Sequence, residues 1–159
     1  NLIEGKMNKK VAILIGSETD RLTMEAANKY YEFFGIKYEI HVKSAHRNPS
    51  DVEDFAKNAR RNGYATLVGA AGMAAHLAGA LKANTTLPVI GVPLAGGILD
   101  GMDALLSTVQ MPKGVPVATV AVGKAGAINA AILSAEIISL YDDAILAKLD
   151  KFKSIGAKL

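Results

Sequence analysis

Near its amino terminus the chain reads Val11-Ala-Ile-Leu-Ile-Gly-Ser-Glu-Thr-Asp20, which is five apolar residues, a glycine and then a polar segment. A short, unbroken apolar run of this kind is typical of a strand buried on both faces of a parallel sheet. Comparable apolar runs at residues 66–69, 88–92 and 115–122 predict three further strands, and residues 38–42 predict another.

The segments between these runs have helical spacing or helix boundary signals. Met24, Ala27, Tyr31 and Phe34 recur every three or four residues and predict a first helix that stops at Gly35. The capping box Ser50-Asp-Val-Glu53 predicts the start of a second helix, which ends at Gly63. An Ala-rich helix is predicted after the third strand and runs through Lys82. The remaining helices are predicted around residues 102–108, from 123–126 to about Leu140, and over 142–155. Strands that alternate with helices predict an α/β fold, a three-layer sandwich around a five-stranded parallel sheet with a C-terminal helix.

The composition fits one compact domain with a core of small side chains. Of the 159 residues, 50% are hydrophobic but only 6% are aromatic, and there are 15 glycines and no Trp. We assign residues 7–159 to a single domain and expect residues 1–6 to be a cloning remnant or a disordered N-terminal segment. The mean hydropathy of +0.23 is high for a solitary domain of this size, which predicts burial between subunits.

Charge and cysteine content narrow the expected partners. Cysteine is absent, which excludes disulfides, thiol nucleophiles and Cys-ligated metal sites and fits a cytoplasmic location. The net charge of +3 comes from scattered Lys and Arg residues, which favours an anionic small ligand over nucleic acid. The most apolar stretch, residues 125–140, is too short and too interrupted to span a bilayer, so no membrane partner is expected.

The fold class itself indicates which loops carry chemistry. In open parallel sheets, ligands bind beyond the carboxyl ends of the strands. This rule selects five loops, at residues 16–20, 44–49, 70–77, 93–101 and 123–126. In the first of them, Ser17, Thr19 and Asp20 either cap the following helix or contact an anionic ligand.

The second loop, Ser44-Ala-His-Arg-Asn-Pro49, places an imidazole beside a guanidinium. Arg47 can bind a phosphate through two hydrogen bonds, and Ser44 can add a hydroxyl. His46 can donate and accept a proton near neutral pH. The alternative interpretation is a surface His beside a surface Arg.

The third loop is made almost entirely of small residues. Around Gly72 they allow a ligand to approach the backbone closely, and His76 either lines the same pocket or packs as an ordinary residue at a helix start. His41 alternates with apolar neighbours in a strand, so we expect it to face solvent and assign it no role.

The sequence lacks the motifs of several common kinds of active site. No pair of His residues has metal-ligand spacing, and neither a phosphate-binding loop of the Gly-x-x-x-x-Gly-Lys-Ser/Thr type nor a Gly-x-Ser-x-Gly elbow occurs. The available groups suit acid–base chemistry on a phosphorylated small molecule, and no metal or cofactor is expected.

Seven motifs occur in order along the chain, and together they resemble the PurE family, the N5-carboxyaminoimidazole ribonucleotide mutases of purine biosynthesis. The motifs are Gly16-Ser-Glu-Thr-Asp20, Ser44-Ala-His-Arg47, Ala74-Ala-His-Leu77, Leu87-Pro-Val-Ile-Gly-Val-Pro93, Gly101-Met-Asp-Ala-Leu-Leu-Ser107, Val109-Gln-Met-Pro112 and Gly114-Val-Pro-Val-Ala-Thr-Val120. The resemblance extends over nearly all of residues 11–140.

The resemblance implies a flavodoxin-like subunit assembled as a homo-octamer, and a ribonucleotide substrate that carries a 5′-phosphate. It also implies transfer of a carboxyl group from N5 to C4 of aminoimidazole ribonucleotide, an isomerase reaction. By position, His46 falls on the general acid/base. The implied substrate contacts are Ser17, Thr19 and Asp20 in the first loop, Ser44 and Arg47 in the second, and Gly72, His76 and Leu77 in the third.

The chain departs from the usual family pattern in the third loop. Ala70 and Met73 stand where the family has glycines, and Ala78 stands where it has proline. A Met side chain in this loop would fill or narrow the space available to CO₂.

Three other functions are alternatives to the mutase. A direct aminoimidazole ribonucleotide carboxylase, a lyase that uses CO₂, is the nearest alternative. The related carboxylase/hydrolase of nickel-pincer cofactor synthesis is expected to use a Cys, which this chain lacks. A non-enzymatic, receiver-like signalling domain would need a phosphoacceptor Asp after the third strand, where the chain has Gly69-Ala-Ala-Gly72.

Overall fold

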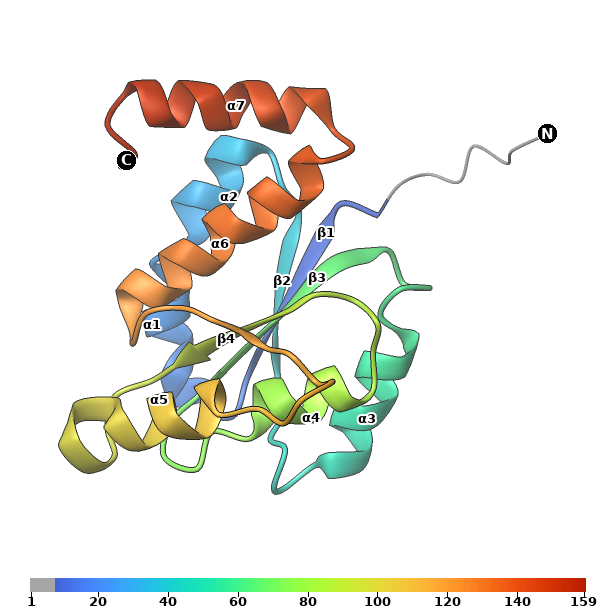
Figure 1. Cartoon of the computed structure of the whole chain (residues 1–159), viewed down its shortest axis with the longest axis vertical. Coiled ribbons are helices and arrows are strands. Elements are labelled where there is room, and N and C mark those ends of the chain that lie inside the picture. The colour runs from blue at the N-terminus through green and yellow to red at the C-terminus, as the bar shows by residue number, and fades with distance from the viewer. Residues whose placement is uncertain (1–7) are drawn as a thin grey trace.

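The computed structural model describes residues 8–159 and shows an α/β fold built on five parallel strands (Figure 1). The strands are β1 (Lys10–Ile15), β2 (Tyr38–Val42), β3 (Tyr64–Ala71), β4 (Val89–Pro93) and β5 (Ala118–Thr119). Their order in the sheet is β2-β1-β3-β4-β5, and every neighbouring pair is parallel. This is the flavodoxin-like order, so the predicted fold class is confirmed. The prediction for residues 1–6 lies outside the described part of the chain.

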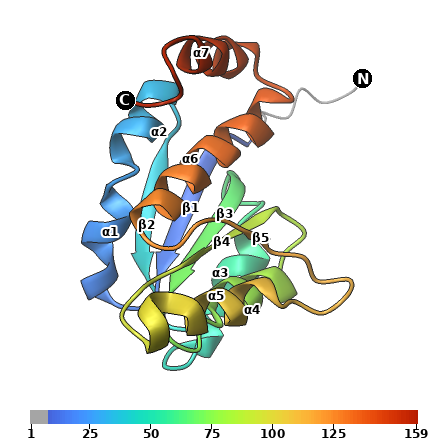
Figure 2. The ribbon, with the colours of Figure 1, turned by 60° about the vertical axis from the view of Figure 1, so that its left-hand side comes forward.

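Helices cover both faces of the sheet (Figure 2). The helices are α1 (Arg21–Glu25), α2 (Asn28–Phe34), α3 (Pro49–Asn58), α4 (Leu77–Ala83), α5 (Met102–Val109), α6 (Lys124–Ser139) and α7 (Asp143–Ser154), with short 3-10 turns η1 (Glu18–Asp20) and η2 (Ile98–Gly101). One face is covered by α1, α2 and α6, and the other by α3, α4 and α5; α7 lies across one end, against α2 and α6. Within residues 8–159, the longest helix has 16 residues and none is long and apolar enough to cross a membrane.

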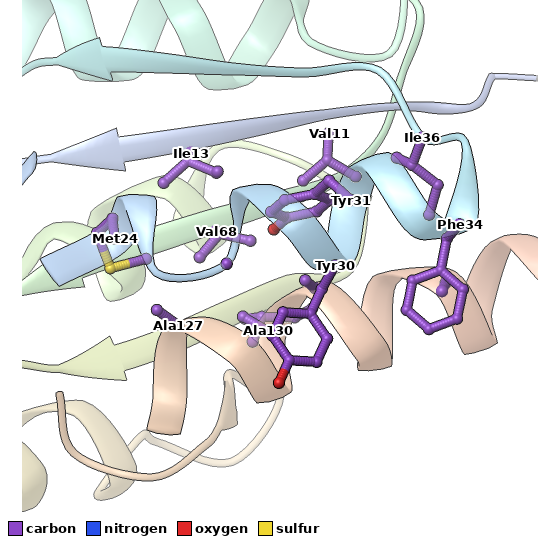
Figure 3. Close-up of a cluster of buried hydrophobic side chains, with 14 of the residues drawn as sticks. Val11, Ile13, Met24, Tyr30, Tyr31, Phe34, Ile36, Val68, Ala127 and Ala130 are labelled. Carbon is purple, nitrogen blue, oxygen red and sulfur yellow. The ribbon is translucent and has the colours of Figure 1, made fainter. Parts of the chain in front are cut away.

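The central strand β1 is buried on both sides, as its apolar run predicts. Alternate residues of β1 face different cores: Val11 and Ile13 join the cluster under α1, α2 and α6, while Ala12 and Leu14 join the cluster under α3 and α4. Figure 3 shows the first cluster, in which side chains of α1 and α2 meet those of β1, β3 and α6. This two-sided burial anchors the loop that follows β1.

Glycines allow two helices to lie unusually close to the sheet. A Cβ added at Gly69 of β3 would lie 2.8 Å from Ala78 Cα in α4, and one added at Gly91 of β4 would lie 2.5 Å from Thr108 Cγ2 in α5. Gly69 and Gly91 therefore let α4 and α5 pack closely against β3 and β4.

Several predicted boundaries were wrong, each for a local reason. The predicted first helix is two helices, because the N–H groups of Ala26 and Ala27 bond three residues back and tighten the chain between α1 and α2. The predicted capping box at Ser50 does not form, because α3 already begins at Pro49. Proline is well suited to the first helical position, where a backbone N–H would have no partner within the helix.

The last predicted strand is also much shorter than expected. Only Ala118 and Thr119 pair with β4, whereas the prediction extended over residues 115–122. Pro116 has no backbone N–H to donate to a neighbouring strand, so regular pairing with β4 begins only after this residue.

Candidate active site

A pocket of about 460 Å³ opens at the carboxyl ends of the first four strands. Its lining residues are Gly16, Ser17, Thr19, Asp20, Ser44, Ala45, His46, Arg47, Ala71, Gly72, Met73, Ala74, Ala75, His76, Leu77, Ala95 and Gly96. Four of the five loops selected by the topology rule contribute to it, and residues 123–126 do not. All nine predicted site residues line this one pocket, although their roles remain predictions.

The loop after β1 contributes two hydroxyls and a carboxylate. The Ser17 hydroxyl oxygen accepts hydrogen bonds from the Thr19 backbone N–H, at 3.4 Å, and from the Thr19 hydroxyl, at 3.0 Å. Ser17 thus caps the short turn η1, and the capping and ligand-contact interpretations are compatible because both side chains also line the pocket. Burial raises the pKa of the Asp20 carboxyl, and a hydrogen bond with the backbone at Ser17 partly opposes that shift.

The loop after β2 is closed by hydrogen bonds around Ser44. The Asn48 N–H donates to the Ser44 carbonyl oxygen at 2.8 Å, and the Arg47 N–H donates to the Ser44 hydroxyl oxygen at 3.2 Å. The Arg47 side chain is exposed, and its guanidinium makes no hydrogen bond or ion pair with another residue of the described chain. The turn therefore presents an uncompensated positive charge at the pocket.

Two histidines from different loops meet in the pocket. His46 Nε2 lies 2.6 Å from His76 Nδ1, and the two rings are nearly perpendicular, with an interplanar angle of 77°. In this hydrogen bond one nitrogen carries the proton and the other accepts it, so each ring constrains the tautomer of the other. His76 immediately precedes α4, which the close contact between Gly69 and Ala78 holds against β3.

The loop after β3 has a strained backbone. The Ala75 N–H donates to the Gly72 carbonyl oxygen at 3.0 Å and closes a tight turn. Within it, Met73 and Ala75 have φ values of +53° and +41°, in the left-handed region that costs a residue with a Cβ about 1–2 kcal/mol. Leu77 reaches the pocket at the first turn of α4, but its side chain is only 1% exposed and belongs to the core below.

Some pocket residues were not among the predicted site residues. Ala95 and Gly96, in the loop after β4, have no reactive group, and only the topology rule that selected their loop pointed to them. The expectation that His41 faces solvent is confirmed only in part, because 31% of its side-chain surface is exposed. Its ring packs 4.9 Å from that of Phe55, and its Nε2 lies 3.2 Å from Glu39 Oε2, away from the pocket.

Comparison with known proteins agrees with the fold. The profile of a family described as AIR carboxylase matches residues 10–158. Two curated relatives are called N5-carboxyaminoimidazole ribonucleotide mutase. The one from Vibrio parahaemolyticus is 48% identical over 91% of this chain and 90% of the relative, and the one from Escherichia coli K12 is 44% identical over 91% and 85%.

A solved structure is similar as well. PurE from Treponema denticola has a TM-score of 0.83 and 29% sequence identity, over 93% of this chain and 91% of that protein. The sequence match thus covers the sheet, its helices and all four loops that line the pocket. This chain belongs to the AIR carboxylase family.

Proposed function

We propose that this protein is an isomerase of purine biosynthesis that converts N5-carboxyaminoimidazole ribonucleotide into 4-carboxy-5-aminoimidazole ribonucleotide. The observation that carries the proposal is the His46–His76 hydrogen bond at 2.6 Å, in the same pocket as the unpaired guanidinium of Arg47. A proton-transferring pair beside an anion-binding group is what a carboxyl shift on a phosphorylated ligand requires. Relatives that carry the mutase name, at 44–48% identity, support the same reaction.

In this proposal the loops after β1 and β2 hold the ribose 5′-phosphate. Arg47 binds two phosphate oxygens, and the Ser44 hydroxyl, which accepts from the Arg47 N–H, donates its own proton to the phosphate. Ser17, Thr19 and Asp20 face the same pocket and bind the ribose-phosphate. Gly72, His76 and the backbone at Leu77 form the wall beside the base.

The proposed reaction runs in two steps on the bound ribonucleotide. His46 donates a proton to the carbamate nitrogen N5, the bond between N5 and the carboxyl carbon breaks, and CO₂ is released beside the electron-rich ring. C4 then attacks the carbon of CO₂, a C–C bond forms, and His46 takes the proton that C4 loses. The proton that leaves His46 in the first step is replaced in the second, so a single side chain serves as acid and then as base.

The contact with His76 supports this double role. Because His46 Nε2 and His76 Nδ1 share one proton, the proposed acid/base has a defined hydrogen-bond partner and ring orientation. The pocket must also retain CO₂ between the steps. The small residues of the loops after β3 and β4 let the bound ligand lie close to the backbone there.

Direct carboxylation of aminoimidazole ribonucleotide is the second candidate, because the family that this chain belongs to is described as AIR carboxylase. The same His46 would then serve only to remove the C4 proton after attack on dissolved CO₂. A receiver-like signalling domain is no longer a candidate, because the chain belongs to a family of enzymes.

Two parallel assays on the purified protein separate the two reactions. One contains N5-carboxyaminoimidazole ribonucleotide, and the other contains aminoimidazole ribonucleotide with bicarbonate. We expect rapid formation of the C4-carboxylated product in the first and slow formation in the second. Rapid turnover in the second assay alone would refute the mutase and establish the carboxylase.

We also propose that the protein works as a homo-octamer in the cytoplasm. Exposed apolar side chains on η2 and α5 support association, and they are Ile98, Leu99, Met102, Leu106 and Val109. Sedimentation of the purified protein tests the octamer, which eight chains of 16.7 kDa would form. A monomer at micromolar concentration would contradict it.

A further inference from the structure

Met73 occupies a backbone position that favours glycine. Its φ of +53° places it at the second position of the turn closed by the Ala75 N–H and the Gly72 carbonyl oxygen. Its side chain is 67% exposed, so contacts within the subunit recover little of the conformational cost. A residue held in a strained conformation without a packing reason points to a function at that position.

The Met73 side chain also differs in chemical character from the other side chains that line the pocket. Among the described residues that line the pocket, Met73 is the only long apolar side chain with substantial exposure, since the Leu77 side chain is buried. The other exposed groups there are hydroxyls, imidazoles, a guanidinium, a carboxylate and small residues. Met73 is therefore the available apolar surface for a flat ring bound in this pocket.

We propose that the Met73 thioether packs on the heteroaromatic base of the bound ribonucleotide and shields the reacting carboxyl group from water. The inference rests on the proposed function for the identity of the base. Methionine suits this task because its side chain is flexible and its sulfur makes favourable contacts with aromatic rings. Exclusion of water keeps a released CO₂ molecule beside the ring. Met73 thus acts in binding and specificity, and proton transfer stays with His46.

Binding measurements with two ligands test the contact directly. Aminoimidazole ribonucleotide contains the base, whereas ribose 5-phosphate has the same phosphate and no base. We expect Met73→Gly to weaken binding of aminoimidazole ribonucleotide about two- to tenfold, the size of a lost sulfur–aromatic contact. Binding of ribose 5-phosphate should not change, and Met73→Leu should keep part of the affinity for the base.

A control variant separates the contact from relief of backbone strain. Ala157 has a φ of +58° and lies at the C-terminal end, outside the pocket. Ala157→Gly and Met73→Gly should both raise the melting temperature, because glycine adopts this conformation without strain. Only Met73→Gly should alter ligand binding.

A label experiment tests the shielding. Substrate with a carbon-13 carboxyl group is converted in unlabelled bicarbonate, and the label retained in the product is measured. Met73→Gly should retain less label than the wild-type protein.

Three results would overturn the inference: equal weakening of both ligands, unchanged affinity for both, or a changed oligomeric state with unchanged affinities. The proposed function fails separately, if the wild-type protein does not convert the carboxylated substrate while the base-dependent effect of Met73 persists.

Discussion

His46 and Arg47 are adjacent in the chain, yet their side chains differ in their hydrogen-bond partners. His46 is held by a hydrogen bond to His76, a residue of another loop, while the Arg47 guanidinium has no partner in the described chain. A group that moves a proton needs a fixed orientation, whereas a group that binds phosphate is best left uncompensated until the ligand arrives. The single-residue predictions follow from this difference.

Replacement of His46 should abolish most turnover without loss of the fold. We expect His46→Asn to lower kcat about 10²- to 10⁴-fold, the usual contribution of a positioned acid/base. His76→Asn should have a smaller effect, because an amide can still hydrogen-bond His46. Steady-state assays give kcat, and circular dichroism confirms the fold. Near-normal turnover in folded His46→Asn would rule out its role.

Replacement of Arg47 should act on binding of the phosphate. We expect Arg47→Gln to weaken binding of ribose 5-phosphate about tenfold, because a hydrogen bond to a charged group contributes about 1.5 kcal/mol or more. Arg47→Lys keeps the charge but loses the bidentate hydrogen bonding of the guanidinium. Its affinity for ribose 5-phosphate should lie between that of the wild-type protein and that of Arg47→Gln. Titration calorimetry at low and high salt measures the effect, which salt should reduce. Equal affinity in all three proteins would place the phosphate elsewhere.

At the scale of elements, the position of α4 decides where His76 lies. The helix can approach β3 because Gly69 has no Cβ opposite Ala78. We expect Gly69→Ala to lower the free energy of unfolding by about 1–3 kcal/mol, since the new Cβ would lie 2.8 Å from Ala78 Cα. It should also lower kcat, because α4 must move and His76 with it.

Chemical denaturation measures the stability of the Gly69 variant. Gly16 supplies the comparison, because a Cβ there would meet nothing within 4 Å, so Gly16→Ala should leave stability nearly unchanged. Equal stability of Gly69→Ala and the wild-type protein would show that the helix–strand contact tolerates a methyl group.

The C-terminal helix α7 depends on its cap. The Asp142 carboxylate accepts hydrogen bonds from the N–H groups of Ala144 and Ile145, at 3.0 and 3.3 Å, and pairs with Lys9 at 2.7 Å. We expect Asp142→Ala to cost about 1 kcal/mol of stability, while Asp142→Asn keeps the cap and costs less. Urea unfolding at neutral pH measures both.

The Asp142 cap also predicts a dependence on pH. The hydrogen bond from Lys9, followed by those from the backbone, lowers the pKa of the Asp142 carboxyl below its ordinary value of 3.8. The ionised carboxylate therefore stabilises the folded state above that ordinary value, and the benefit is lost as the pH falls through the lower pKa of the folded protein. The stability difference between wild-type protein and Asp142→Asn should accordingly shrink in acid. A difference that grows in acid would contradict this account.

At the scale of the whole molecule, η2 and α5 form an apolar surface that the described part of the subunit leaves uncovered. Leu106 on α5 is 58% exposed. We expect Leu106→Asp to shift the assembly toward smaller species, because a charge buried between subunits is costly. Sedimentation velocity measures the change. Ser154→Asp places the same charge at the end of α7, far from α5 in both views, and should leave the assembly intact (Figures 1 and 2).

An assembly unaffected by Leu106→Asp would mean that subunits associate through another face. The alanines of α6 offer no such face. Ala127, Ala130, Ala131 and Ala135 are fully buried against the sheet of their own subunit.

Much of this molecule follows from local patterns. The apolar runs place β1, β3 and β4, because strands buried on both faces consist almost entirely of apolar residues. Once the sheet is parallel, its carboxyl edge collects the loops that hold Ser17, His46 and Gly72, and the family motifs supply their expected roles. The sequence alone therefore determines the fold class and points to the loops that line the pocket.

Other features depend on contacts between distant segments, which no local pattern contains. The His46–His76 hydrogen bond joins residues 30 positions apart, and His76 immediately precedes α4, which packs closely on β3 opposite Gly69. His41 is partly covered by the ring of Phe55 in α3. Met73 has a backbone conformation that favours glycine, and its apolar side chain lines the pocket. Both features depend on where its turn lies relative to the folded sheet. Packing across the sheet, rather than the identity of neighbouring residues, determines these features.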